Sequence, residues 1–111
     1  MTQLLDDLRA LDALFSDESK WTQGYLARDA NGIAVECLHS DAVCWCLGGA
    51  AMKVSEGATH RYGRICEALH DATPRSAYNN FVIWNDRASR KFHQVKSLIA
   101  RAIATEEGRS S

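Results

Sequence analysis

The amino-acid sequence predicts an all-α fold: a single small domain of about four principal helices around a buried central helix. One short hairpin is compatible with this fold. Apolar residues recur every three or four positions near both ends of the chain, as amphipathic helices require. Between them, an almost uninterrupted apolar run covers residues 42–52. Because 111 residues hold one core, we expect one helical domain over residues 1–107 and a frayed tail over residues 108–111.

Residues 3–15 are predicted to form the first amphipathic helix. The large apolar residues of this segment fall on one side of a helix, which a surface helix turns toward the core. They are Leu4, Leu8, Leu11 and Phe15, with Leu5 and Leu14 beside them. The polar residues 16–20 that follow form a joint suited to start a further turn.

A tight turn is predicted at Asn31 and Gly32, because Asn-Gly is a strong turn signal. The short apolar pieces at residues 25–27 and 33–35 flank this turn and fit a small hairpin. A helix over residues 21–28 followed by a loop is the alternative, since an isolated hairpin is only marginally stable.

Residues 40–55 are predicted to form the buried central helix, because almost no polar residue interrupts them. Ser40 or Asp41 is expected to cap its first turn. Gly48 and Gly49 each cost about 1 kcal/mol relative to alanine inside a helix. We therefore expect either the close approach of another backbone at these glycines or a break in the helix.

The second half of the chain is predicted to hold two further helices. Thr59 is the expected N-cap of the first, and Pro74 ends it, because the residue before a proline avoids helical geometry. The apolar residues 81–84 fit either one helical turn or a buried strand. Asp86 is the expected N-cap of the last helix.

The Trp-Asn-Asp segment at residues 84–86 has two interpretations. In the structural one, Trp84 packs in the core, Asn85 makes a turn and Asp86 caps the last helix. In the functional one, Asn85 and Asp86 form a polar binding pocket with Trp21 or Tyr78.

Three short segments occur in a familiar order. They are an aromatic-Leu-Ala-Arg-Asp at residues 25–29 with Gly32 after it, Trp-Cys-Leu and small residues at 45–50, and Trp-Asn-Asp at 84–86. Over residues 21–104 the chain therefore resembles a family of small bacterial and phage-encoded proteins of unknown function. The resemblance implies a single helical domain and gives weight to residues 84–86. It implies no activity, because the family has none assigned.

Cys37, His39, Cys44 and Cys46 lie within ten positions and are candidate metal ligands. Their spacing is not that of a zinc finger or ribbon, which pairs ligands two to four residues apart. On a helix, moreover, Cys44 and Cys46 point to different sides. We therefore expect no metal and no cofactor, and interpret the cysteines as small core residues.

A catalytic hypothesis places Cys44 in the first turn of the central helix, where the helix dipole lowers the pKa of a thiol. A histidine such as His39 would act as the base, and Asn85 or Asp86 would orient it. No local signature of a cysteine hydrolase accompanies these residues.

The charge is nearly balanced, with 13 basic and 14 acidic residues, which disfavours nucleic acid as a general partner. The alternative is nucleic-acid binding through a basic last helix. Its basic residues are Arg87, Arg90, Lys91, Lys96 and Arg101. The apolar run is shorter than the roughly 20 residues that span a bilayer, and the acidic start is not a signal peptide. We expect a cytoplasmic protein without a membrane segment.

These observations favour a small binding or interaction module, whose partner is another protein or a second copy of the chain in a homo-oligomer. The absence of a catalytic signature weighs against an enzyme. Trp21, Trp84, Asn85 and Asp86 are the expected binding residues. The alternative is a small enzyme or ligand-binding protein that uses Cys44 with Asn85 and Asp86.

Overall fold

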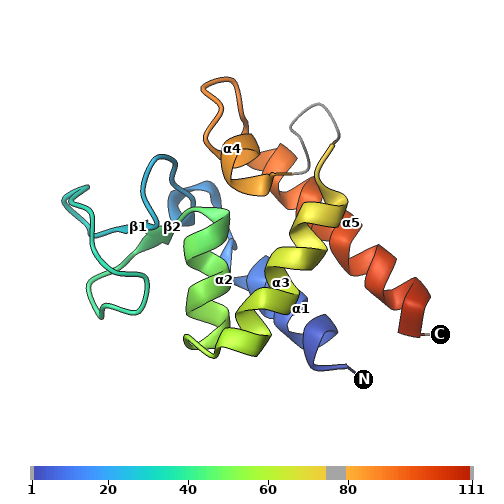
Figure 1. The fold of residues 1–111 in the computed structure, drawn as a ribbon. Helices are drawn as coiled ribbons and strands as arrows, with labels where there is room; N and C mark the ends of the chain where they lie inside the picture. The colour runs from blue at the N-terminus through green and yellow to red at the C-terminus, as the bar shows by residue number, and fades with distance from the viewer. Residues whose placement is uncertain (1, 75–79, 111) are drawn as a thin grey trace.

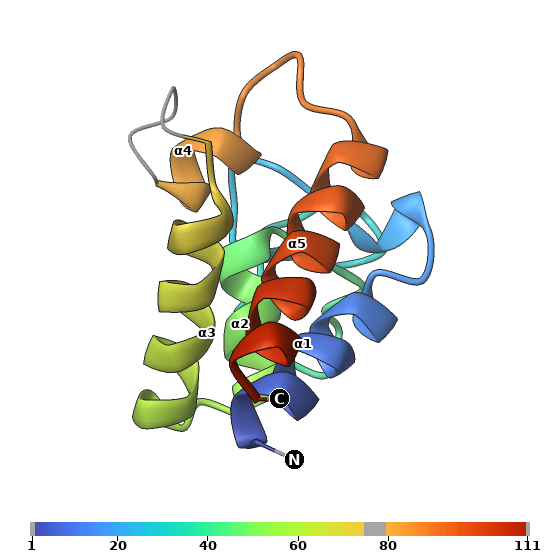
Figure 2. The same ribbon diagram turned by 90° about the vertical axis from the view of Figure 1, so that its right-hand side faces the viewer.

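The computed structural model describes residues 2–74 and 80–110, and the described chain is mostly helical (Figure 1). Its elements in chain order are α1 (Gln3–Leu14), the 3-10 turn η1 (Glu18–Lys20), β1 (Ala27–Arg28), β2 (Cys44–Trp45), α2 (Leu47–Ser55), α3 (Thr59–Ala72), α4 (Phe81–Asn85) and α5 (Phe92–Ser110). Helices α1, α3 and α5 pack against one another, and α2 packs against α1, α3 and α4 (Figure 2). The predicted predominance of helix is confirmed.

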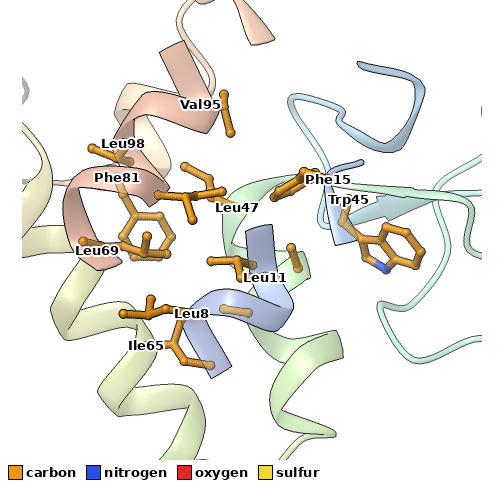
Figure 3. Packing of buried hydrophobic residues seen from close by; sticks show 14 of the residues in the cluster. Leu8, Leu11, Phe15, Trp45, Leu47, Ile65, Leu69, Phe81, Val95 and Leu98 are labelled. Atoms are coloured by element: carbon orange, nitrogen blue, oxygen red, sulfur yellow. The ribbon is translucent and has the colours of Figure 1, made fainter. Parts of the chain in front are cut away.

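The core consists mainly of apolar side chains from all five α-helices, joined by Ala27 of β1, Trp45 of β2 and Cys37. Figure 3 shows these side chains converging on one cluster. Its members include Leu8 and Leu11 of α1 and its C-cap Phe15, Leu47 of α2, Ile65 and Leu69 of α3, Phe81 of α4, and Val95 and Ile99 of α5. The apolar faces predicted for the first and last helices therefore point into one core. Among the described residues, no helix is long and apolar enough to cross a membrane.

The buried central helix is shorter than predicted. It begins at Leu47, so Ser40 and Asp41 do not cap it; the N-cap is Cys46, whose sulfur accepts from the backbone N–H of Gly49 (3.3 Å). The preceding residues 44–45 form β2, which pairs antiparallel with β1. The apolar run misled the prediction because a buried strand and a buried helix have the same composition over a few residues.

The two glycines of α2 behave differently. A Cβ atom at Gly49 would overlap the carbonyl oxygen of Leu26, whereas at Gly48 the nearest neighbouring atoms lie 3.8 Å away. The predicted close approach of another backbone is therefore confirmed at Gly49, and the helix continues unbroken through both residues.

The Asn31-Gly32 turn is present, and the alternative of a helix over residues 21–28 is wrong. Gly32 has φ +80°, and the Asp29 carboxylate accepts from the backbone N–H groups of Asn31 and Ile33. A single bridge joins Arg28 to Ala34 across the turn. The main strand partner of β1 is nevertheless β2, which lies farther along the chain and which sequence spacing does not identify.

Two predictions about helix ends in the second half of the chain are wrong. Thr59 lies inside α3, whose N-cap Ala58 has no side-chain hydrogen bond. Asp86 is the C-cap of α4, because α5 starts only at Phe92. Helix α5 runs to Ser110, and an ion pair between Arg9 and Glu107 (2.7 Å) joins its last part to α1. Residues 81–84 are helical, and Asn80 caps them.

Replacing Gly49 by alanine tests the close approach between α2 and the backbone at Leu26. We expect Gly49→Ala to lower the free energy of unfolding by about 3 kcal/mol, because the new methyl group has no space. Chemical denaturation measures this change.

Gly63→Ala is the matched control, since Gly63 is also helical and has no atom within 4 Å of the added Cβ. It is expected to raise stability by about 0.5–1 kcal/mol. Equal effects of the two substitutions would show that the backbones do not approach closely.

Candidate functional site

Asn85, the last residue of α4, is the centre of a buried hydrogen-bond network and is only 1% exposed. Its side-chain oxygen accepts from the indole N–H of Trp21 (2.8 Å) and from the backbone N–H of Leu47 (3.4 Å). Its amide nitrogen donates to the Asp86 carboxylate (2.9 Å) and to the Thr22 carbonyl (3.4 Å). The amide thus connects α4 to the start of α2 and to residues 21–22.

Two further contacts hold residues 23–24 against the end of α4. The Asp86 carboxylate accepts from the backbone N–H of Gly24 (3.0 Å). The Gln23 side chain donates to the carbonyl oxygens of Asn85 and Arg87, at 2.7 Å each. Among the described residues, every fully buried side-chain nitrogen and oxygen has a hydrogen-bond partner. The network is therefore complete without a ligand, and its first role is to position the chain around it.

The structure brings together Trp21, Asn85 and Asp86, three of the four residues expected to bind. Trp84, the fourth, is buried in the core and lies under the guanidinium of Arg90, which is 3.9 Å from the ring centroid. The Arg90 Nε–H also donates to the Trp84 carbonyl (2.8 Å). Tyr78, the alternative aromatic partner, lies outside the described residues.

A surface groove of about 580 Å³ lies beside this network. We call it the Leu26 groove and define it by the lining residues Tyr25, Leu26, Val35, Glu36, Val82 and Asp86. Its large apolar side chains are unusually open to solvent: Tyr25 is 54% exposed, Leu26 56% and Val82 46%. Glu36 and Asp86 are its two carboxylates.

A second, smaller hollow of about 250 Å³ continues this apolar surface. Leu26 and Glu36 line both hollows, and Leu38 and Met52 extend the lining. This surface is not predictable from the sequence, because its residues come from separate short segments. The only signal in the sequence was the presence of large apolar residues beside the Asn31-Gly32 turn. A small hairpin is too marginal to bury such side chains.

Cys44 lies in β2 and not at a helix start, so the predicted dipole effect on its thiol is lost. Its S–H group is 3.9 Å from the carbonyl oxygen of Arg28. His39, the proposed base, instead accepts from the backbone N–H of Asp41 (3.0 Å) on the surface. No hydrogen bond among the described residues joins Cys44 to His39 or to Asp86.

The cysteine at the helix start is Cys46, and it lines the Leu26 groove. Burial raises the pKa of the Cys46 thiol, and burial likewise raises the pKa of Cys37 and Cys66. These thiols therefore stay protonated at neutral pH, a state that neither attacks carbonyl groups nor binds metal well. Among the described residues, no three His, Cys, Asp or Glu side chains are close enough to hold a metal ion.

The basic residues of the predicted last helix fall into two groups. Arg87, Arg90 and Lys91 precede α5. Within α5, Lys96 forms an ion pair with Asp12 (2.7 Å), and Arg101 donates to the carbonyl oxygen of Ala72 (3.1 Å). The helix therefore does not present one continuous basic face.

Removing the Asn85 amide tests whether the network holds the site together. Asn85→Ala leaves the indole N–H of Trp21 and the backbone N–H of Leu47 without their acceptor. We expect a loss of about 3 kcal/mol in the free energy of unfolding, because buried unsatisfied donors are costly. Urea denaturation followed by tryptophan fluorescence measures it.

Asn31→Ala is the control, because Asn31 is exposed in the turn and its side chain makes no hydrogen bond in the described chain. This variant should stay within about 0.5 kcal/mol of the native protein. If both variants unfold at the same urea concentration, Asn85 does not organise the site.

Comparison with known proteins gives a family but no activity. Residues 1–105 match a protein family described as a family of unknown function (DUF6197). No match was found among curated proteins or among solved structures. The match covers nearly the whole chain, including the Trp-Cys-Leu and Trp-Asn-Asp segments and the Asn85 network. The chain therefore belongs to this family of unknown function, as its resemblance predicted.

Proposed function

We propose that this chain is a small protein-interaction module that binds an apolar segment of a partner in the Leu26 groove. The observation that carries this proposal is the exposure of Tyr25, Leu26 and Val82 around one hollow of about 580 Å³. Leaving such side chains in water is unfavourable, and clustered exposed apolar residues mark interaction surfaces.

The backbone beneath the groove is fixed before any partner arrives. The Leu26 carbonyl accepts from the backbone N–H of Cys46 (3.2 Å), and its oxygen lies directly over Gly49. On the other side, Asp86 holds the backbone of Gly24. A surface that is already ordered loses little conformational entropy on binding, which favours affinity.

The charges of the groove indicate the chemistry of the partner. Glu36 is exposed and forms no ion pair among the described residues, and Asp86 adds a second carboxylate. A partner segment with a large apolar residue next to a lysine or arginine would fill the hollow and place its cation near these carboxylates. Complementary charges of this kind speed association and select the partner.

A selection from a random peptide library against the immobilised folded chain tests the proposal. Enriched peptides are expected to combine a large apolar residue with Lys or Arg. Val82→Asp should weaken their binding at least about tenfold, because it places a charge against the apolar anchor. Fluorescence polarisation of a labelled selected peptide measures the affinity.

Ile83→Asp is the matched control: Ile83 is the next residue of α4, is 58% exposed and does not line the groove. It should leave peptide affinity within about twofold. Glu36→Lys should reduce binding of the basic peptides. A selection without enrichment, or equal binding by the Val82→Asp and native proteins, would contradict the proposal.

Sedimentation velocity of the purified chain tests whether the partner is a second copy of the same chain. Self-association that Val82→Asp abolishes and Ile83→Asp retains would make the partner another copy of this protein. A monomer at all concentrations would leave a different protein as the partner.

A further inference from the structure

A separate hollow of about 340 Å³ lies between the end of α3, α4 and the first half of α5. We call it the Arg101 pocket and define it by the lining residues Trp84, Arg90, His93, Gln94, Ser97 and Arg101. It shares no lining residue with the Leu26 groove among the described residues. Figure 2 shows α3 and α5 running side by side, with α4 near their upper ends.

The charge of this pocket has one sign. Arg90 and Arg101 line it, and no described carboxylate does. Neither arginine forms an ion pair with a carboxylate of the described chain. Burial, and then the positive charge of Arg87, lowers the pKa of Arg90. The guanidinium groups are therefore cations without a compensating anion in the described part of the protein.

Both arginines are held in place by neutral contacts that leave donors unused. Arg90 stacks on Trp84 and donates through Nε to the Trp84 carbonyl and through Nη1 to Gln94 (3.3 Å). Arg101 donates through Nη1 to the Ala72 carbonyl. A guanidinium carries five N–H donors, so each arginine keeps N–H groups without an acceptor in the described chain. His93 and Ser97 add further polar groups to the lining.

We propose that the Arg101 pocket binds the phosphate group of a small ligand. Two fixed guanidinium groups suit a tetrahedral dianion, because each can donate two parallel hydrogen bonds to its oxygens. The volume lies near the lower end of the range for small-molecule sites. This site is independent of the Leu26 groove, and its test does not depend on the proposed interaction function.

The surrounding charges favour a small ligand over a nucleic acid. A nucleic-acid backbone needs an extended track of cations. Along α5, however, Lys96 is paired with Asp12, and Arg109 lies 3.9 Å from Glu106. Lys96 and Arg109 therefore do not extend the positive charge of the pocket into a track along α5.

Titration of the ¹⁵N-labelled full chain with inorganic phosphate and with phenyl phosphate, at constant ionic strength, tests the proposal. Saturable shifts are expected at the indole N–H of Trp84, the Nε–H of Arg90 and the amides of residues 97–101, with a Kd of about 1 mM or tighter. Arg101→Gln should weaken binding about tenfold, because it removes charge-assisted hydrogen bonds.

Lys91→Gln is the matched control, since it removes the same charge from an exposed residue that does not line the pocket. It should change the affinity by less than about threefold. Arg101→Lys keeps the charge but not the planar fork, and should bind with intermediate affinity. Thermal unfolding of each variant checks that it is folded.

Several outcomes would overturn the proposal. Shifts that rise linearly and are equal for chloride and phosphate would show only ionic-strength effects. Equal weakening by Arg101→Gln and Lys91→Gln would show that the pocket itself is not the site. Acetate binding as tightly as phosphate would overturn the choice of phosphate. A short DNA duplex that saturates the same signals at lower concentration than phosphate would identify nucleic acid as the ligand instead.

Discussion

The buried hydrogen bonds of the Asn85 amide are the interactions on which the arrangement of α4, the start of α2 and residues 21–24 depends. The amide accepts hydrogen bonds from Trp21 and Leu47 and donates to Thr22 and Asp86. An isolated helix as short as α4 is not stable in water, because one turn fixes several residues for few hydrogen bonds. The amide, together with burial of Phe81 and Trp84, supplies the tertiary contacts that hold this turn in place.

Once α4 is fixed, its residues and its C-cap contribute to two different surfaces. Val82 and Asp86 line the Leu26 groove, whereas Trp84 lines the Arg101 pocket beneath Arg90. The groove is apolar with carboxylates, and the pocket carries arginines without described carboxylates. This separation of charge is absent from the overall composition, in which 13 basic and 14 acidic residues nearly cancel. Net charge therefore says little about the local charge of either surface.

Helix position and burial have opposite effects on the pKa of the Cys46 thiol. Cys46 occupies the N-cap of α2, where backbone N–H groups would favour a thiolate. Burial acts in the opposite direction and raises the pKa of this thiol, with the hydrogen bonds from Gly49 and Gly48 as smaller effects. Its sulfur serves as an acceptor for the helix start. These surroundings support a structural role for Cys46 beside the Leu26 groove.

The sequence alone determined the features that depend on neighbouring residues. The spacing of Leu4, Leu8 and Leu11 specified the buried face of α1, and Asn31-Gly32 specified its turn. Pro74 marked the end of α3, and the paired glycines of the central helix indicated a close backbone approach, which occurs at Gly49. For the Trp-Asn-Asp segment the sequence left two interpretations open, and a pocket of Asn85 and Asp86 with either Trp21 or Tyr78 was one of them.

Only the tertiary structure decided the features that join distant parts of the chain. Residues 44–45 are a strand because β1 satisfies their backbone groups, although their apolar composition fits a helix equally well. Asp86 binds Gly24, 62 positions away, instead of capping α5. The Leu26 groove and the Arg101 pocket likewise collect side chains from several elements. Such sites depend on how the elements pack. Packing determines which side chains stay exposed to water and which charges stay unpaired, and the periodicity of the sequence does not.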